Sequence, residues 1–267
     1  MSGNNNEILN GSKNAIGGDS NSIKNGNENV VIGDRNSISN GSLNQIQGGQ
    51  NSILNGNNNK IEGNVNSVEG SGNKLKTNNT NVKGNLNEAI GNNLTVKGDQ
   101  NLLKGNSSTI IGNENILIGD NHTVTGDKNQ LNGTSNKING QFNIVGGSDN
   151  EVNGHVNDIL GNTNIVNGNI NKVYGNDNKL TGNENKVAGD KNSLTGNNSV
   201  VKGSRNTLNG NENLLMGSDN KITGDLNAAE GDKNNIVGSE NSLFGNENNV
   251  DGNKNALTGN NNNLRGN

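Results

Sequence analysis

The segment Asn183-Glu184-Asn185-Lys186-Val187-Ala188-Gly189 is one copy of a seven-residue repeat that runs unbroken from Asn57 to Gly266. These 210 residues divide into 30 copies of x-x-N-x-Φ-x-G, where Φ is apolar. The third position is Asn in 25 copies, the fifth is Ile, Val, Leu or Ala in all 30, and the seventh is Gly in 29, with Thr77 as the exception. A period this strict predicts a solenoid in which each copy stacks on its neighbours.

Each copy predicts one short strand. Strand side chains alternate between the two faces, so an inward Val187 leaves Lys186 and Ala188 pointing outward. Gly189 suits the corner because glycine tolerates positive φ. Asn185 is expected to point inward and to bond the backbone and the equivalent Asn of neighbouring coils, since a buried amide without partners is costly.

Two copies make one coil. Between residues 4 and 63, copies of eight and seven residues alternate, and each longer copy carries an extra Asn, namely Asn10, Asn25, Asn40 and Asn55. An insertion in every second copy places alternate copies on the same side of the coil. We therefore expect an all-β, two-sided β-solenoid without helices, in one domain over 1–267. One long and one short copy give each of the four coils over 4–63, and two short copies give each coil over 64–266, which makes about 18 coils in all.

Composition narrows the class of protein. Only 25% of the 267 residues are hydrophobic and 1% aromatic, which is too little for a globular core, while the fixed phase of the apolar residues argues against disorder. The net charge of −4, with both signs interspersed, disfavours nucleic acid as a partner. The sequence has no cysteine, no signal peptide and no apolar stretch long enough for a membrane span, so localisation stays unassigned.

No catalytic, cofactor or metal site is expected, and the protein is predicted not to be an enzyme. The Gly-Gly steps at 17–18, 48–49 and 146–147 lack the Asp rows of calcium-binding rolls. His122 and His155 have no nucleophile arrangement, and the predicted fold offers no cleft.

The two outward faces differ. One carries mostly Thr, Asn, Ser and Lys, for which exposed β-propensity is the simplest explanation. The other is more apolar and includes a candidate contact face for a partner, formed by Ile116, Ile118, Leu214, Met216 and Phe244. On the Thr-bearing side, four successive copies replace the inward Asn, by Thr80, Leu94, Ser108 and His122. This break indicates either a local change in packing or a site.

The motif x-x-N-x-V-x-G, at two copies per coil, resembles the ice-recrystallisation-inhibition (antifreeze) β-rolls of grasses such as perennial ryegrass. Asp120-Asn121-His122-Thr123-Val124-Thr125-Gly126 and Ser204-Arg205-Asn206-Thr207-Leu208-Asn209-Gly210 are examples, and the likeness covers essentially the whole chain. The resemblance implies a non-enzymatic ice-binding protein whose partner is ice or an ordered water surface, met by a flat Thr/Ser/Asn face. It maps this role onto Thr95, Thr109, Thr123, Thr125, Thr181, Ser193, Thr195, Thr207 and Thr223.

Charged residues interrupt that face, and charged side chains hold water in a non-ice arrangement. The interruptions are Lys97, Lys137, Glu151, Lys179 and Lys221.

A second hypothesis concerns self-assembly. The repeat starts by residue 4 and stops half a coil over at Gly266, with no capping segment, whereas solenoids usually cap their open strand edges. The alternative function is therefore a structural β-solenoid that assembles head to tail into a fibre, or through the apolar face. Carbohydrate binding or hydrolysis is disfavoured because aromatics and paired carboxylates are missing.

Overall fold

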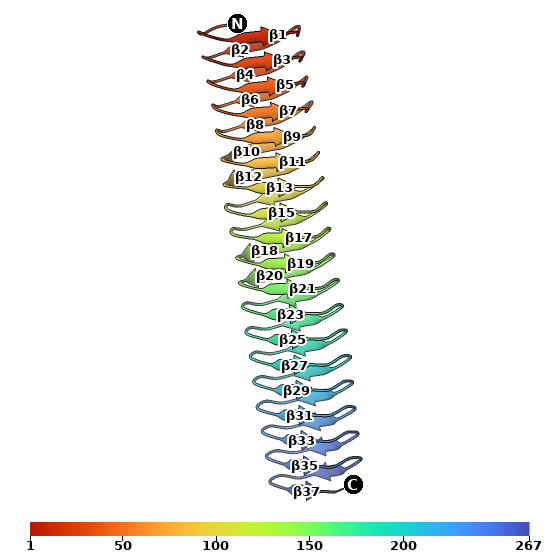
Figure 1. Cartoon of the computed structure of the whole chain (residues 1–267). Coiled ribbons are helices and arrows are strands. Elements are labelled where there is room, and N and C mark those ends of the chain that lie inside the picture. Colours follow the sequence, from red (N-terminus) through yellow and green to blue (C-terminus); the bar gives the residue numbers. More distant parts are fainter. Residues whose placement is uncertain (267) are drawn as a thin grey trace. The chain divides into compact units, whose positions relative to one another are not determined.

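The computed structural model describes residues 1–266, which form 37 short strands and no helix. They fall into two compact units, Met1–Ser135 and Asn136–Asn267. In each unit the chain winds through parallel strands, and each coil contributes one odd-numbered and one even-numbered strand (Figure 1). The expected all-β two-sided solenoid of about 18 coils is confirmed. Its organisation as one domain stays a prediction.

The odd-numbered strands of each unit form a parallel sheet, here called the odd sheet. In the N-terminal unit these strands are β1 (Glu7–Leu9), β3 (Ser22–Lys24), β5 (Ser37–Ser39), β7 (Ser52–Leu54), β9 (Ser67–Glu69), β11 (Asn81–Lys83), β13 (Thr95–Lys97), β15 (Thr109–Ile111) and β17 (Thr123–Thr125). In the C-terminal unit they are β19 (Lys137–Asn139), β21 (Glu151–Asn153), β23 (Ile165–Asn167), β25 (Lys179–Thr181), β27 (Ser193–Thr195), β29 (Thr207–Asn209), β31 (Lys221–Thr223), β33 (Asn235–Val237), β35 (Asn249–Asp251) and β37 (Asn263–Arg265).

The even-numbered strands form the opposite, even sheet of each unit. In the N-terminal unit they are β2 (Ala15–Gly17), β4 (Val30–Ile32), β6 (Gln45–Gln47), β8 (Lys60–Glu62), β10 (Lys74–Asn78), β12 (Glu88–Asn92), β14 (Leu102–Lys104), β16 (Ile116–Ile118) and β18 (Gln130–Thr134). In the C-terminal unit they are β20 (Ile144–Ser148), β22 (Asp158–Leu160), β24 (Lys172–Tyr174), β26 (Lys186–Ala188), β28 (Val200–Lys202), β30 (Leu214–Met216), β32 (Ala228–Glu230), β34 (Ser242–Phe244) and β36 (Ala256–Thr258).

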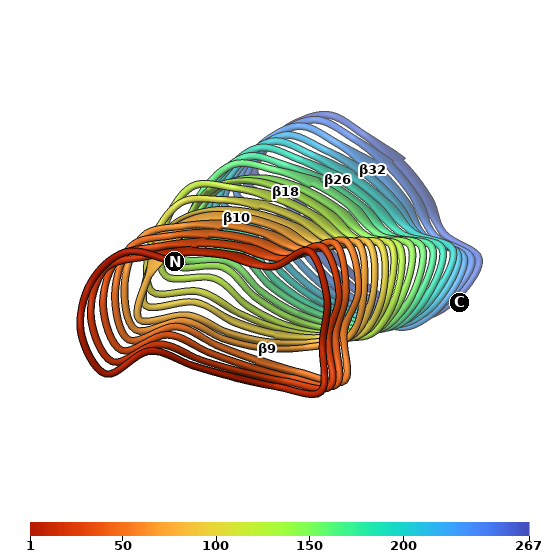
Figure 2. The same cartoon turned by 90° about the horizontal axis from the view of Figure 1, so that it is seen from above.

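The register follows the repeat length. Up to the pair Ser52↔Ser67, strand partners are separated along the chain by one long and one short copy, and from Lys60↔Lys74 onward they are separated by two short copies. Within the N-terminal unit each coil therefore follows the outline of the one before it (Figure 2). The middle residue of a strand points inward, as Val187 does at 2% exposure, and burying such an aliphatic side chain contributes about 1.5–3 kcal/mol.

The inward Asn residues form the expected ladder. Asn164 is fully buried and donates from its backbone N–H and from Nδ2 to Oδ1 of Asn150, both at 3.0 Å. Its Nδ2 also donates to the Gly175 carbonyl at 2.8 Å, and its Oδ1 accepts the backbone N–H and Nδ2 of Asn178 at 3.0 and 3.1 Å. Each amide thus satisfies the polar groups that a corner brings into the core.

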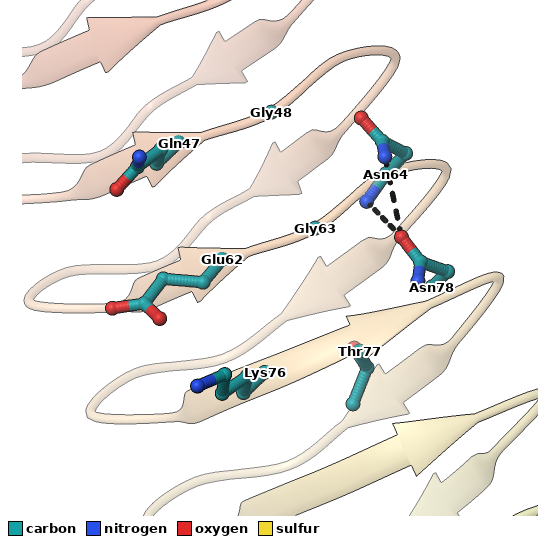
Figure 3. A pocket seen from close by; sticks show the side chains of 8 residues that line it. All are labelled: Gln47, Gly48, Glu62, Gly63, Asn64, Lys76, Thr77 and Asn78. Carbon is teal, nitrogen blue, oxygen red and sulfur yellow. Dashed lines mark hydrogen bonds between the residues drawn. The ribbon is translucent and has the colours of Figure 1, made fainter.

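A second ladder, which sequence reasoning did not predict, runs outside the first. The side chain of the first residue of a copy accepts a hydrogen bond from the backbone N–H of the equivalent residue one coil earlier. Asn176 Oδ1, for example, accepts from the backbone N–H and the Nδ2 of Asn162 at 2.8 and 3.1 Å. Figure 3 shows the same arrangement between Asn64 and Asn78, at 2.8 and 3.3 Å. This ladder explains why Asn, Asp and Ser recur at the first position.

The corner also fixes the glycine. Gly161 has φ +140, and a Cβ there would lie 1.9 Å from the Gly175 carbonyl oxygen, so the stacking of coils leaves no space for a side chain. Thr163, two residues on, has φ 59, and the equivalent residue of nearly every corner shares this left-handed conformation. The corners are therefore strained for most residue types and held by the two ladders.

Thr77, the exception to the glycine rule, compensates for a second exception. It lies in the extended part of β10, opposite Gly91, and its side chain is turned inward at 3% exposure. Its Oγ1 donates to Asn66 Oδ1 at 2.9 Å. In a standard coil, the side-chain amide of the inward Asn one coil later donates this hydrogen bond to the Asn oxygen. Here the residue one coil after Asn66 is Thr80, which donates to Asn66 Oδ1 only from its backbone N–H, at 3.1 Å.

Candidate functional site

The odd sheet presents two outward rows, which we call the leading row (first residue of each strand) and the trailing row (third residue). All nine Thr and Ser residues that the resemblance singled out lie in these rows. Thr95, Thr109 and Thr123 are leading and Thr125 is trailing in the N-terminal unit. In the C-terminal unit the leading residues are Ser193 and Thr207, and the trailing ones are Thr181, Thr195 and Thr223.

In the N-terminal unit the leading row is free of charge over eight successive coils. The side chains are short, partly or fully exposed, and in register at the strand spacing of about 4.8 Å. They are Ser22, Ser37, Ser52, Ser67, Asn81, Thr95, Thr109 and Thr123.

In the C-terminal unit it is the trailing row that is free of charge, over eight successive coils that end at Val237. The first seven carry short polar side chains, namely Asn139, Asn153, Asn167, Thr181, Thr195, Asn209 and Thr223.

The charges that interrupt the odd sheet are therefore segregated. Lys97 lies in the trailing row of the N-terminal unit, and Lys137, Glu151, Lys179 and Lys221 all lie in the leading row of the C-terminal unit. Part of this charge is paired, since Lys137 Nζ lies 3.0 Å from Glu151 Oε1. Each unit thus keeps one long uncharged run beside one mixed row, and the charges outside these runs are Glu7 at the start of the leading row and Asp251 and Arg265 at the end of the trailing row.

Beneath the leading row of the N-terminal unit lies the break in the Asn ladder. Thr80, Leu94, Ser108 and His122 are all buried, at 2% exposure or less. Thr80 Oγ1 accepts the Leu94 N–H at 3.4 Å and Ser108 Oγ accepts the His122 N–H at 3.0 Å, whereas the side chain of Leu94 has no acceptor. The break is thus a change in packing under β11, β13, β15 and β17, and it adds no group to the surface.

His122 is the one titratable side chain in this column. Burial lowers its pKa below the ordinary value, against a smaller opposing effect of the Ile118 and Gly133 carbonyls, and Nε2 lies 3.4 Å from the Ile118 oxygen. The ring therefore favours the neutral form in the folded chain.

The predicted contact residues lie on the even sheet. Ile116 and Ile118 are 39% and 46% exposed on β16 of the N-terminal unit, and Leu214, Met216 and Phe244 lie outward on β30 and β34 of the other unit. Sequence reasoning missed further apolar residues at the corners, because they fall outside the strand positions that it compared.

Within residues 1–266, no helix is long and apolar enough to cross a membrane, and no three His, Cys, Asp or Glu side chains come together as metal ligands.

The model of the grass antifreeze β-roll family matches residues 1–98, 76–168 and 159–245. The chain belongs to this family. Its matches run through both units and so include both uncharged rows. Membership of the antifreeze β-roll family supports ice binding as the class of function, and the family is not an enzyme class. A search of curated proteins gives no match.

The two uncharged runs also contain residues to which the resemblance assigned no role, among them Ser22, Ser37 and Ser52 and the four Asn residues of the C-terminal unit's trailing row. The sequence could have revealed the three Ser residues. If the eight-residue copies are aligned with the later seven-residue copies on the inward apolar residue, Ser22, Ser37 and Ser52 fall in the same row as Ser67.

Proposed function

We propose that the protein adsorbs to ice through its odd sheet and thereby inhibits ice recrystallisation. The observation that carries the proposal is the segregation of charge, which leaves the leading row of the N-terminal unit uncharged from Ser22 to Thr123 and the trailing row of the C-terminal unit uncharged from Asn139 to Thr223. Family membership supports ice as the partner.

Uncharged and charged side chains hold water differently. Short Ser, Thr and Asn side chains on rigid strands have few conformations to lose, and their hydroxyls and amides repeat at about 4.8 Å. Waters bridging such groups are held in a repeating order. A Lys or Glu keeps its own hydration shell, whose removal is costly, so an uncharged row is the better contact for a water lattice.

Matched substitutions test this argument. Ser67→Lys and Thr195→Lys place a charge in the middle of each uncharged row, whereas Ser39→Lys and Ser193→Lys add the same charge to the neighbouring mixed rows. In an ice-grain growth assay, the S67K/T195K variant should lose most of its inhibition, and S39K/S193K should stay close to the native chain. Equal losses in both variants would contradict the proposal.

Head-to-tail assembly into a fibre, the second hypothesis from the sequence, stays a prediction. Electron microscopy of the purified chain tests it, because unbranched filaments would support it and discrete particles at every concentration would refute it.

A further inference from the structure

Two successive corners leading into the even sheet of the C-terminal unit carry β-branched apolar residues. Val156 and Ile170 each have φ 60 and are each 53% exposed. Equivalent corners of the next coils hold Glu184 and Asn198. A β-branched residue in the left-handed region strains the backbone, and its exposure adds an unfavourable contact with water. These positions therefore work against the stability of the isolated chain.

The same two coils expose further apolar surface. On β22 and β24, Leu160 is 60% exposed and lies in register with Tyr174, which is 41% exposed. Between these apolar columns, Asp158 is in register with Lys172. The patch is thus two apolar columns that flank one acidic and one basic side chain, and the Tyr174 hydroxyl donates to Asp158 Oδ2 at 2.7 Å.

We propose that a second copy of this chain docks on this patch, forming a two-fold symmetric dimer through the even sheets of two C-terminal units. Consider a two-fold axis in the plane of the interface, parallel to the strands and midway between β22 and β24. It reverses the order of coils and keeps the position along each strand. Asp158 then faces Lys172 of the second copy, and Lys172 faces its Asp158.

The same operation matches the apolar columns. Leu160 faces Tyr174 of the second copy and Val156 faces its Ile170, so each row of the two central strands, β22 and β24, meets a complementary row. Such self-complementarity is what an isologous interface requires. Charge complementarity thus argues for a second copy as the occupant.

The size of the patch sets the expected strength. Four strands, β20 to β26, at about 4.8 Å and five residues at about 3.3 Å give a contact of roughly 19 by 16 Å. This is about 300 Å² per copy, well below a standard interface, so the association is expected to be weak and reversible and to depend on the complementarity of the patch and not on its area. The contact uses only the even sheet of the C-terminal unit and none of its odd sheet, and the inference is independent of the proposed function.

Sedimentation of the full chain above freezing, over a series of protein concentrations, tests the proposal without involving ice. A reversible monomer–dimer equilibrium is expected. Asp158→Lys and Lys172→Asp should each weaken it by about tenfold or more, because like charges then face each other. Mixing the two variants should restore association, since the charges of unlike copies are again complementary. A native chain that stays monomeric throughout, or a mixture that fails to associate, would overturn the proposal.

The corner residues provide a second test. Asn tolerates the left-handed conformation, so V156N/I170N should keep or raise the stability of the monomer while association is lost. Dimers that survive this change and the charge reversals would place the interface elsewhere and refute the assignment.

Discussion

Removing one rung of the inner Asn ladder should have a large and local effect. In Asn164→Ala, the Gly175 carbonyl loses its amide donor and the Asn178 backbone N–H loses its acceptor. The Asn178 amide keeps its other hydrogen bond, to the Gly189 carbonyl at 2.8 Å. Two buried polar groups left unpaired cost about 1–3 kcal/mol each, so the local loss of stability should be about 3–5 kcal/mol with the small cavity included.

Native-state hydrogen exchange is the appropriate assay, because a solenoid opens locally and a single unfolding midpoint averages over many coils. The amides of the coils around residue 164 should lose protection by this amount in Asn164→Ala. Asn164→Ser should lose about half as much local stability as Asn164→Ala. Native Ser199 shows that a hydroxyl can accept the backbone N–H of the next coil, since Ser199 Oγ accepts from the Asn213 N–H at 3.1 Å. Asn169→Ala is the control, because its side chain accepts the His155 N–H and donates to Asn183 Oδ1 in the exposed outer ladder, where the expected cost is below about 1 kcal/mol. A loss in Asn164→Ala no larger than this control would refute the reasoning.

Three further predictions follow from particular contacts. Thr77→Gly should destabilise its coil by about 1–2 kcal/mol in native-state hydrogen exchange, and adding Thr80→Asn should restore the loss, because the amide replaces the missing hydroxyl. Gly168→Ala should prevent stable stacking, seen as lost β circular dichroism, because its Cβ would lie 1.9 Å from the Gly182 carbonyl oxygen at φ +140. Since burial lowers the pKa of His122, the stability it supports is complete above about pH 6.5 and is lost as pH falls towards its folded value. His122→Asn should therefore flatten the loss of stability that the native chain shows as pH falls below about 6.5, measured by unfolding over a series of pH values.

The coil could be predicted from the sequence because its determinants repeat. Each copy has an apolar residue at its fifth position and Asn at its third. Only one arrangement buries the apolar side chain and also gives the buried Asn its hydrogen-bond partners, as Val187 and Asn164 illustrate. The alternation of long and short copies before position 63 identified which copies share a face. The change in register offset between the pairs Ser52↔Ser67 and Lys60↔Lys74 follows from it.

Other features depend on contacts between coils that a single copy does not reveal. The outer ladder at Asn162 needs the geometry of the corner, and the role of Thr77 needs its distance to Asn66 on the preceding coil. The uncharged rows were visible in part. Treating Lys97 and Lys137 as interruptions of one face concealed that they stand in different rows of different units.

The most direct test of the account is the partition of fluorescently labelled protein into slowly growing ice. The account predicts that the native chain and the S39K/S193K variant are incorporated into the ice, while S67K/T195K is rejected into the liquid as an ordinary solute is. Rejection of the native chain, or incorporation of S67K/T195K at the native level, would contradict the claim that the uncharged rows of the odd sheet bind ice.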